Sequence, residues 1–322
     1  MNRVVNSMVA LLAVLTSGAA QAQAWPQKPI KIVIPFVAGG SSDIVGRAIG
    51  SKFHEYLGQP AVVENRPGAN GSIAAEFVAK SDPDGYTILV GSIGVFSINA
   101  ALFKDLRYNP MRDFAPITLA VTTPNVLVTK PEMPVASMKE LVEFAKKNPD
   151  KLSYCSSGTG SSDHLTGEVF KQTAGTTAVH VPYKGGAACQ TDIMGGQVDY
   201  SFQNLGAVTA YIKGGKMKAI AVTSNARNPQ LPNVPSVTEA GFPGLVVTSW
   251  QAVVAPAKTP KEIIAKLNDA IVKTLNSPEV KERMAQIGFD VVAGTPDEFG
   301  AFMKAEIDRW SKVVEVGKIK AE

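Results

Sequence analysis

The sequence predicts an α/β protein made of two lobes, each built around a sheet of largely parallel type. Short apolar segments alternate with amphipathic helical segments, and this alternation begins again near residue 137. The residues after 259 read almost wholly as helix. The 322 residues, 45% of them hydrophobic, provide enough chain for two cores.

The first lobe is predicted from strands at 30–36, 61–64 and 86–90, with helices at 44–57 and 72–80 between them. Connections of this length suit parallel strands joined by helices. A strand within 122–131 then leaves this unit.

The second lobe begins with a helix opened by a capping box at Ser137 and Glu140, and a strand near Trp250 carries the chain back. The lobe boundaries are therefore placed at 25–125 plus 249–322 for the first lobe and 126–248 for the second. The other elements of the second lobe are predicted as strands 152–156, 178–181, 197–202 and 218–224, a helix at 163–173, a helix ending within 192–196, and a proline-rich loop at 227–236.

The C-terminal helices are expected to pack back on the first lobe. Capping boxes with proline at the first helical position are predicted at Thr259–Glu262 and Thr295–Glu298, and Ser277-Pro278 begins another helix.

The first 24 residues have the pattern of a secretory signal peptide. Arg3 precedes an apolar run at 9–18, and Ala22-Gln23-Ala24 is a small-x-small cleavage site, so cleavage is expected after Ala24. The run is too short to span a bilayer. An exported, periplasmic protein is expected.

Charge and cysteine content narrow the functional classes. The net charge of +4 is small and evenly spread, which argues against a nucleic-acid partner. Cys155 and Cys189 are the two cysteines. In an oxidising compartment they form a disulfide, or else both are buried as free thiols.

Two joints between a strand and a helix share an unusual composition. The first is Gly39-Gly40-Ser41-Ser42-Asp43, and the second contains Ser156, Ser157 and the run Gly158-Thr159-Gly160-Ser161, ending in Asp163. Small residues leave backbone N–H groups accessible at the positive start of a helix, where a carboxylate or phosphate binds well. The alternative is a pair of ordinary capped turns, in which Asp43 is an N-cap; in a pocket, Asp43 would instead receive an ammonium group.

Several side chains at predicted strand ends are candidates to contact a ligand together with the two joints. They are Phe36, Ser92, Tyr183, Phe202 and Asn204. For each of them, packing or capping is an equally good explanation.

Catalytic and metal-binding patterns are not found. His54, His164 and His180 lack metal-ligand spacing, the nucleophile elbow GxSxG does not occur, and neither dinucleotide nor Walker motifs are complete. No catalytic residue, metal or cofactor is predicted.

An ordered set of motifs resembles the substrate-binding receptors of tripartite tricarboxylate transporters, also called the Bug family. The motifs are PFVAGGSSDIVGRAI, VVENRPGANGSIAAEFVAKSDPDGYTILVGS, YCSSGTGSSDHLTGEVF, HVPYKGGAA, GGQVD, IAVTSNAR, LPNVPSVTEAGFPG and WxxxxAPxxTP. Together they span nearly all of the chain after residue 24.

The resemblance implies a two-lobed periplasmic binding protein of the type II-like clamshell kind. It implies a small organic carboxylate held between the lobes and delivered to membrane permease subunits, by a protein expected to be a monomer. It maps the carboxylate grip to Phe36 and residues 39–43, and the opposing motif to 156–161 with Tyr183 nearby. Cysteines near positions 155 and 189 in some relatives favour the disulfide. Ala187-Ala188-Cys189 departs from the family, where a proline is common.

Two other functions remain open at this stage. One is a sensor that binds the same ligand and signals to a two-component kinase. The other is a periplasmic hydrolase or lyase acting on an organic acid, in which replacing Ser41 or Ser161 would abolish turnover more than affinity.

Overall fold

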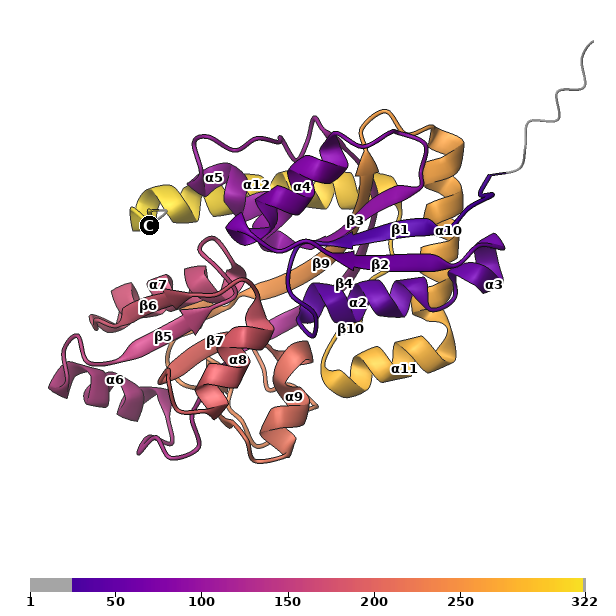
Figure 1. Cartoon of the computed structure of the whole chain (residues 1–322). Helices are drawn as coiled ribbons and strands as arrows, with labels where there is room; N and C mark the ends of the chain where they lie inside the picture. The colour runs from indigo at the N-terminus through magenta and orange to yellow at the C-terminus, as the bar shows by residue number, and fades with distance from the viewer. Residues whose placement is uncertain (1–24, 321–322) are drawn as a thin grey trace, which may run out of the picture.

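The computed structural model describes residues 25–320, and the predicted signal peptide lies outside this range. Figure 1 shows two lobes between which the chain crosses on long strands. The strands are β1 (Ile30–Ile34), β2 (Ala61–Asn65), β3 (Thr87–Ser92), β4 (Phe114–Thr129), β5 (Ser153–Ser156), β6 (Val179–Pro182), β7 (Tyr200–Asn204), β8 (Lys218–Val222), β9 (Thr248–Pro256) and β10 (Asp290–Val291).

The helices follow the predicted alternation, except that the helix predicted at 44–57 is two helices and that α5 and α9 were not predicted. They are α2 (Ser41–Gly50), α3 (Phe53–Leu57), α4 (Ser72–Ala79), α5 (Asn99–Leu102), α6 (Met138–Lys147), α7 (Ser162–Ala174), α8 (Gly186–Met194), α9 (Leu205–Lys213), α10 (Lys261–Asn276), α11 (Pro278–Ile287) and α12 (Pro296–Gly317), with short turns η1 (Ala69–Gly71), η2 (Gly94–Ile98) and η3 (Pro243–Leu245). Within residues 25–320, no helix is both long and apolar enough to cross a bilayer.

The strand β4 belongs to both lobes. Its residues 114–124 pair with β9, and its residues 125–129 pair with β7 and β8. The change of partner follows Pro124, which has no N–H to donate to a ladder. Strand order is β2-β1-β3-β9-β4-β7-β5-β6, with β1 parallel to both β2 and β3, and β5 parallel to both β6 and β7.

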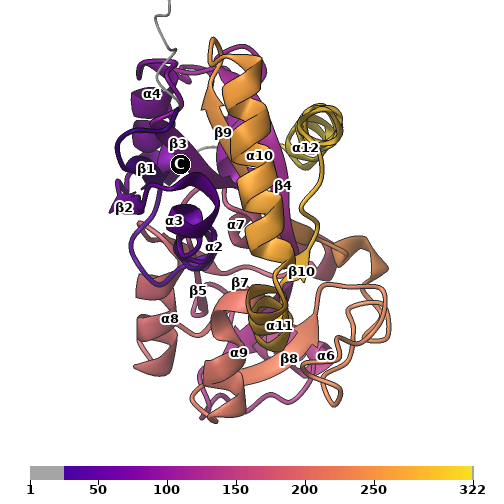
Figure 2. The ribbon, with the colours of Figure 1, turned by 90° about the vertical axis from the view of Figure 1, so that its right-hand side faces the viewer.

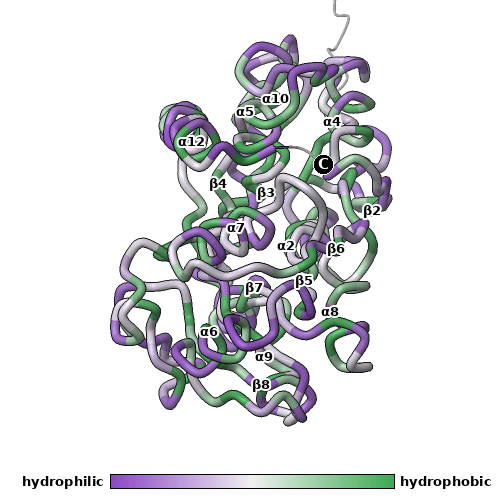
Figure 3. The backbone as a smooth tube through the Cα atoms, turned by 90° about the vertical axis from the view of Figure 1, so that its left-hand side faces the viewer, coloured by the Kyte–Doolittle hydropathy of each residue, from purple (hydrophilic) through white to green (hydrophobic). Residues whose placement is uncertain are grey.

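The sheet of the first lobe is covered on both faces. Ile30, Ile32 and Ile34 of β1 pack in one core cluster with residues of α2 and α10, whereas Val33 packs in the opposite cluster. Burial on both faces explains why β1 is apolar throughout instead of alternating. In Figure 3, hydrophobic stretches follow the strands, and hydrophilic residues lie on outer helices such as α12.

The C-terminal helices pack on the first lobe, as predicted, with α10 and α12 against β4 (Figure 2). The capping box at Thr295 and Glu298 is confirmed. The box predicted at Thr259 is wrong, because α10 begins only at Lys261 and the Thr259 hydroxyl donates to the Pro256 carbonyl (2.8 Å). Glu306 on α12 accepts hydrogen bonds from the indole N–H groups of Trp250 (2.9 Å) and Trp310 (3.2 Å).

The lobes also touch each other away from the crossing strands. On one side α9 packs on α11, where the Thr209 hydroxyl donates to the Ile287 carbonyl (2.8 Å). A Cβ on Gly206 would lie 2.3 Å from the Phe289 ring, so this approach requires glycine. On another side the Val37 N–H donates to the Lys184 carbonyl (3.4 Å).

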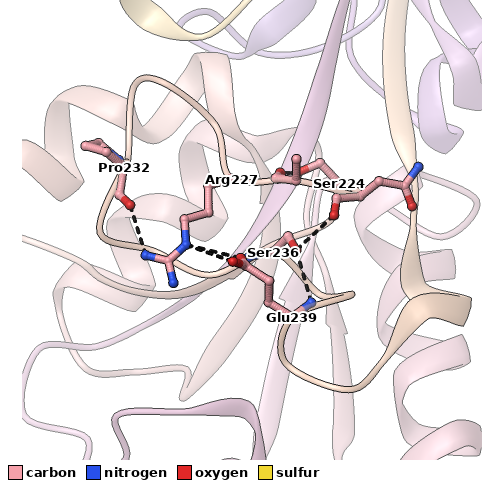
Figure 4. A network of polar contacts seen from close by, with 7 residues as sticks. Ser224, Arg227, Pro232, Ser236 and Glu239 are labelled. Carbon is pink, nitrogen blue, oxygen red and sulfur yellow. Dashed lines mark hydrogen bonds and ion pairs between the residues drawn. The ribbon is translucent and has the colours of Figure 1, made fainter.

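The proline-rich segment after β8 is held by its own polar network (Figure 4). Arg227 pairs with Glu239 (3.1 Å) and donates to the Pro232 carbonyl (3.1 Å). The Glu239 carboxylate also accepts from the Ser236 N–H (2.8 Å), and the Ser236 hydroxyl accepts from the Glu239 N–H (3.1 Å). The predicted loop is therefore ordered without a regular element.

Candidate functional site

The first joint is held from behind by Asp43. Its carboxylate accepts hydrogen bonds from the Gly39 N–H (2.9 Å), the Arg47 guanidinium (3.0 Å) and the Asn65 amide (2.9 Å). Burial raises the pKa of Asp43, but these hydrogen bonds outweigh burial and hold the pKa below its usual value.

Two expectations for this joint need correction. Asp43 is the third residue of α2 and not its N-cap, which is Gly40. Asp43 does not line the cavity between the lobes described below, and its carboxylate is already bonded to Gly39, Arg47 and Asn65, so it is not free to receive an ammonium group. The Gly39 N–H is likewise occupied, and Gly39 (φ +87°) instead lies against Ala187 of the second lobe.

The second joint is more deeply buried. Ser161 is the N-cap of α7: its hydroxyl accepts from the His164 N–H (3.3 Å) and donates to the Gly158 carbonyl (2.6 Å). Asp163 follows as the second helical residue of α7. Its carboxyl group accepts from the Ser157 N–H (2.7 Å), the Ser157 hydroxyl (2.8 Å) and Gln203 (3.1 Å). Burial raises the pKa of Asp163 despite these bonds.

The two joints meet at a cavity of about 40 Å³ between the lobes. Its walls combine predicted residues with others that sequence reasoning missed. The predicted residues are Phe36, Gly40, Ser41, Ser42, Ser92, Ser157, Ser161 and Asn204. The other lining residues, none of which was predicted as a ligand contact, are Ser162 and Asp163 of the second joint, Gly186, Gln190, Gln203, Ala207, Ser249 and Gln251.

Four helices begin at this cavity. The residues that line it include the first turns of α2, α7, α8 and α9. Each helix start has unpaired N–H groups and roughly half a positive charge. Among the described residues that line the cavity, none is lysine, arginine or histidine. The arrangement suits an anion bound by backbone and hydroxyl donors.

Two of these helix starts were not predicted as such. Gly186, the first residue of α8, lines the cavity. Asn204 is the N-cap of α9, and its side-chain amide donates to the Asn125 side-chain oxygen (2.5 Å) at the crossing of β4. Asn204 thus fixes the α9 start against the strand that joins the lobes.

The strand β9 contributes Gln251 to the cavity wall. This side chain is fully buried, and neither polar atom of its carboxamide has a hydrogen-bond partner among the described residues. Ser92 lies opposite Gln251 in the β3–β9 pair. A glutamine inside the otherwise apolar run WQAVVAP was a signal in the sequence that could have identified it.

Several predicted site residues lie outside the cavity. Gly158 and Gly160 pack on Asn70 of the first lobe, so they contribute to contact between the lobes. The Ser156 hydroxyl is bonded to His180 (2.7 Å). The remaining predicted residue of this joint, Thr159, does not line the cavity either.

Tyr183 and Phe202 are also directed elsewhere. The Tyr183 hydroxyl donates to Asp192, and burial together with that carboxylate raises the pKa of Tyr183 to about 12. Phe202 is fully buried in the core of the second lobe, 5.6 Å from the Phe170 ring centroid.

Cys155 and Cys189 form a disulfide, with their Cα atoms 5.7 Å apart. The bridge joins the end of β5, beside the second joint, to α8. It therefore ties together two of the segments that line the cavity.

The histidines of the second lobe form a stack behind the joint. The rings of His164 and His180 are 4.3 Å apart, and His164 Nδ1 accepts from the Gly160 N–H (3.1 Å). Burial, followed by the neighbouring His180, lowers the pKa of His164 to about 3. Within residues 25–320, no cluster of His, Cys, Asp or Glu is arranged to hold a metal ion.

The model of the tripartite tricarboxylate transporter family receptor, TctC, matches residues 45–318. The chain belongs to this family. A curated TctC relative, BugT of Bordetella pertussis, is 36% identical over 317 residues, covering 96% of this chain and 97% of BugT.

Solved structures agree with this assignment. Rpa4515 of R. palustris with adipate has a TM-score of 0.89 and 36% identity, covering 92% of this chain and 99% of that one. MatC from Rhodopseudomonas palustris with bound malate has a TM-score of 0.87 and 32% identity, covering 90% and 100%. The protein is thus a TctC-family periplasmic solute-binding protein with the two-lobed fold of that class, and a receptor instead of an enzyme.

Proposed function

We propose that this receptor captures a small organic carboxylate between its lobes and delivers it to the membrane subunits of a tripartite-type transporter. The observation that carries the proposal is the meeting of four helix starts at one cavity without a cationic side chain. A carboxylate there would accept hydrogen bonds from backbone N–H and hydroxyl groups. Bound adipate in Rpa4515 and bound malate in MatC support this ligand class.

The site and the lobes are part of the proposal. Ligand contacts are proposed for the cavity-lining members of the predicted set, namely Phe36, Gly40, Ser41, Ser42, Ser92, Ser157, Ser161 and Asn204. The lobes are taken as 25–125 plus 249–322 and 126–248, closing about the crossings of β4 and β9. The mature protein would begin after Ala24 and act as a monomer.

The direct test is calorimetry of the purified mature protein against mono-, di- and tricarboxylates. At least one acid should bind and raise the melting temperature, since a ligand of the native state stabilises it by RT ln(1 + [L]/Kd). If no organic acid binds, the proposed ligand class is wrong. Delivery is tested separately by uptake of the bound acid in cells with and without this receptor.

Ser41→Pro tests the role of the helix starts. Proline is tolerated at the first helical position, and Gly40 before it is extended (φ −82°, ψ 172°). The substitution removes two donors at the α2 start, the Ser41 N–H, which no helical carbonyl accepts, and the Ser41 hydroxyl. We expect affinity to fall about tenfold or more, because a hydrogen bond to a charged group contributes roughly 1.5–3 kcal/mol. Lys261→Pro, at the exposed first position of α10, is the matched control and should leave affinity unchanged. Equal affinities for the two variants would show that the α2 start does not bind the ligand.

A further inference from the structure

Gln251 has two buried hydrogen-bonding atoms and uses neither. Its side chain is 0% exposed, and both its Oε1 and its Nε2 lack a partner among the described residues. Native proteins rarely leave a buried polar atom unpaired, because its lost hydration is then not replaced. Since Gln251 lines the cavity, a group that enters the cavity is the natural partner.

The other glutamines of the cavity differ from Gln251. Gln190 donates to Gln203 Oε1 (3.1 Å), and Gln203 Nε2 donates to Asp163 (3.1 Å). These two side chains are fixed by the second lobe itself. Gln251, by contrast, has no hydrogen-bond partner among the described residues.

The backbone holds Gln251 rigidly at this place. Residue 251 pairs with Ser92 on β3 and with Val121 on β4, so β9 is bonded on both sides here. Its neighbour Trp250 points into the hydrophobic core, and alternation along the strand directs Gln251 to the opposite face. The backbone at Gln251 is therefore fixed by strand pairing on both sides.

A carboxamide presents one acceptor and one donor side by side. Its complement is a group that both donates and accepts, such as a hydroxyl or another carboxamide. A carboxylate only accepts: it could satisfy Nε2, but its negative oxygen would face Oε1. A second carboxylate is therefore a poor partner for Gln251.

We infer that Gln251 determines specificity by binding a hydroxyl or carboxamide group that the ligand carries in addition to its carboxylate. This inference rests on the proposed function, in which the helix starts bind the carboxylate. The ligand class is thus a hydroxy acid or half-amide.

Paired ligands of equal length test the inference. Calorimetry is performed with propionate against lactate, and with succinate against malate and succinamate. Three proteins are compared: the wild type, Gln251→Met and the control Gln286→Met. Gln286 is an exposed glutamine on α11. We expect wild type and the control to bind the hydroxyl or amide member about tenfold more tightly than its partner, since an unmatched buried polar group penalises the poorer ligand. Gln251→Met should reduce that ratio to about twofold or less.

A second measurement separates ligand recognition from a structural role. Methionine is similar in length and removes the unpaired polar atoms, so free Gln251→Met should melt no lower than wild type. Equal affinity of wild type for succinate, malate and succinamate would overturn the inference and leave the proposed function standing. Lower melting of Gln251→Met with an equal loss of affinity for all acids would also overturn it. Absence of binding by every acid would instead refute the proposed function.

Discussion

Gly160 of the second lobe lies against Asn70 of the first lobe. A Cβ at position 160 would be 2.9 Å from Asn70 Nδ2 and 2.9 Å from Asn99 Oδ1. Asn70 and Asn99 are themselves bonded (2.8 Å), so neither can easily withdraw. With a φ of +89°, Gly160 also has a backbone conformation that favours glycine. This glycine thus permits the contact between the lobes.

Gly160→Ala should therefore keep the lobes apart. We expect the affinity for the tightest-binding acid to fall at least about tenfold, because the added methyl group must displace Asn70 or Asn99 whenever the lobes meet. Small-angle X-ray scattering at saturating ligand should give a larger radius of gyration for the variant than for wild type.

Gly175→Ala is the matched control. Gly175 has a φ of +61° at the end of α7, with no other atom close to the position of its Cβ. It shares the backbone strain but not the clash, so it should lower stability and leave closure intact. If both variants close normally with ligand, the contact at Gly160 does not limit closure.

The fold and its two joints could be read from local patterns, because apolar periodicity and small-residue turns act within a few residues of the chain. The pattern could not assign a partner to each small residue. Gly158 and Gly160 lie in a joint rich in glycine and serine, like the joint that contains Gly39 and Gly40. They nevertheless pack on Asn70, which is far away in the sequence. Composition identifies accessible backbone, but only the tertiary arrangement decides whether another lobe or a ligand approaches it.

Errors in the predicted elements also have local physical causes. The predicted helix at 44–57 is two helices, because the Ser51 hydroxyl donates to the Ala48 carbonyl (2.7 Å) and α2 ends there. Serine competes with the helical backbone in this way, although apolar periodicity continues beyond it. The α9 start was missed for a different reason, since Asn204 ends a strand and caps a helix at once.

The disulfide between Cys155 and Cys189 should contribute about 3–4 kcal/mol to stability. The cysteines are 34 residues apart, and closing a loop of this size restricts the unfolded chain by roughly that free energy. We expect urea unfolding of Cys155→Ala/Cys189→Ala to give a lower free energy of unfolding by this amount. Wild type under strong reductant should approach the variant, whereas equal stability of oxidised wild type and variant would contradict the estimate.

Protonation of His164 should destabilise the protein below about pH 6.5. An unfolded histidine titrates near 6.5, whereas burial and His180 lower the pKa of His164 to about 3. Between these values the unfolded chain binds the additional proton, so the stabilisation present above pH 6.5 is progressively lost as the pH falls toward 3. The Glu168 carboxylate raises the pKa of His164 and the Lys171 ammonium lowers it. The pKa of about 3 is the result with both charges present. The contribution lost between pH 7 and pH 5 is about 2 kcal/mol.

His164→Asn removes this titration and retains an acceptor for the Gly160 N–H. Urea unfolding at pH 7.5, 6 and 5 should show the variant less stable at pH 7.5, because ring packing is lost, and the difference from wild type should narrow by about 2 kcal/mol at pH 5. His54→Asn, at an exposed position of α3, should follow the wild-type pH dependence. A parallel loss of stability in wild type and His164→Asn would mean that folding does not lower the pKa of His164, and would contradict the prediction.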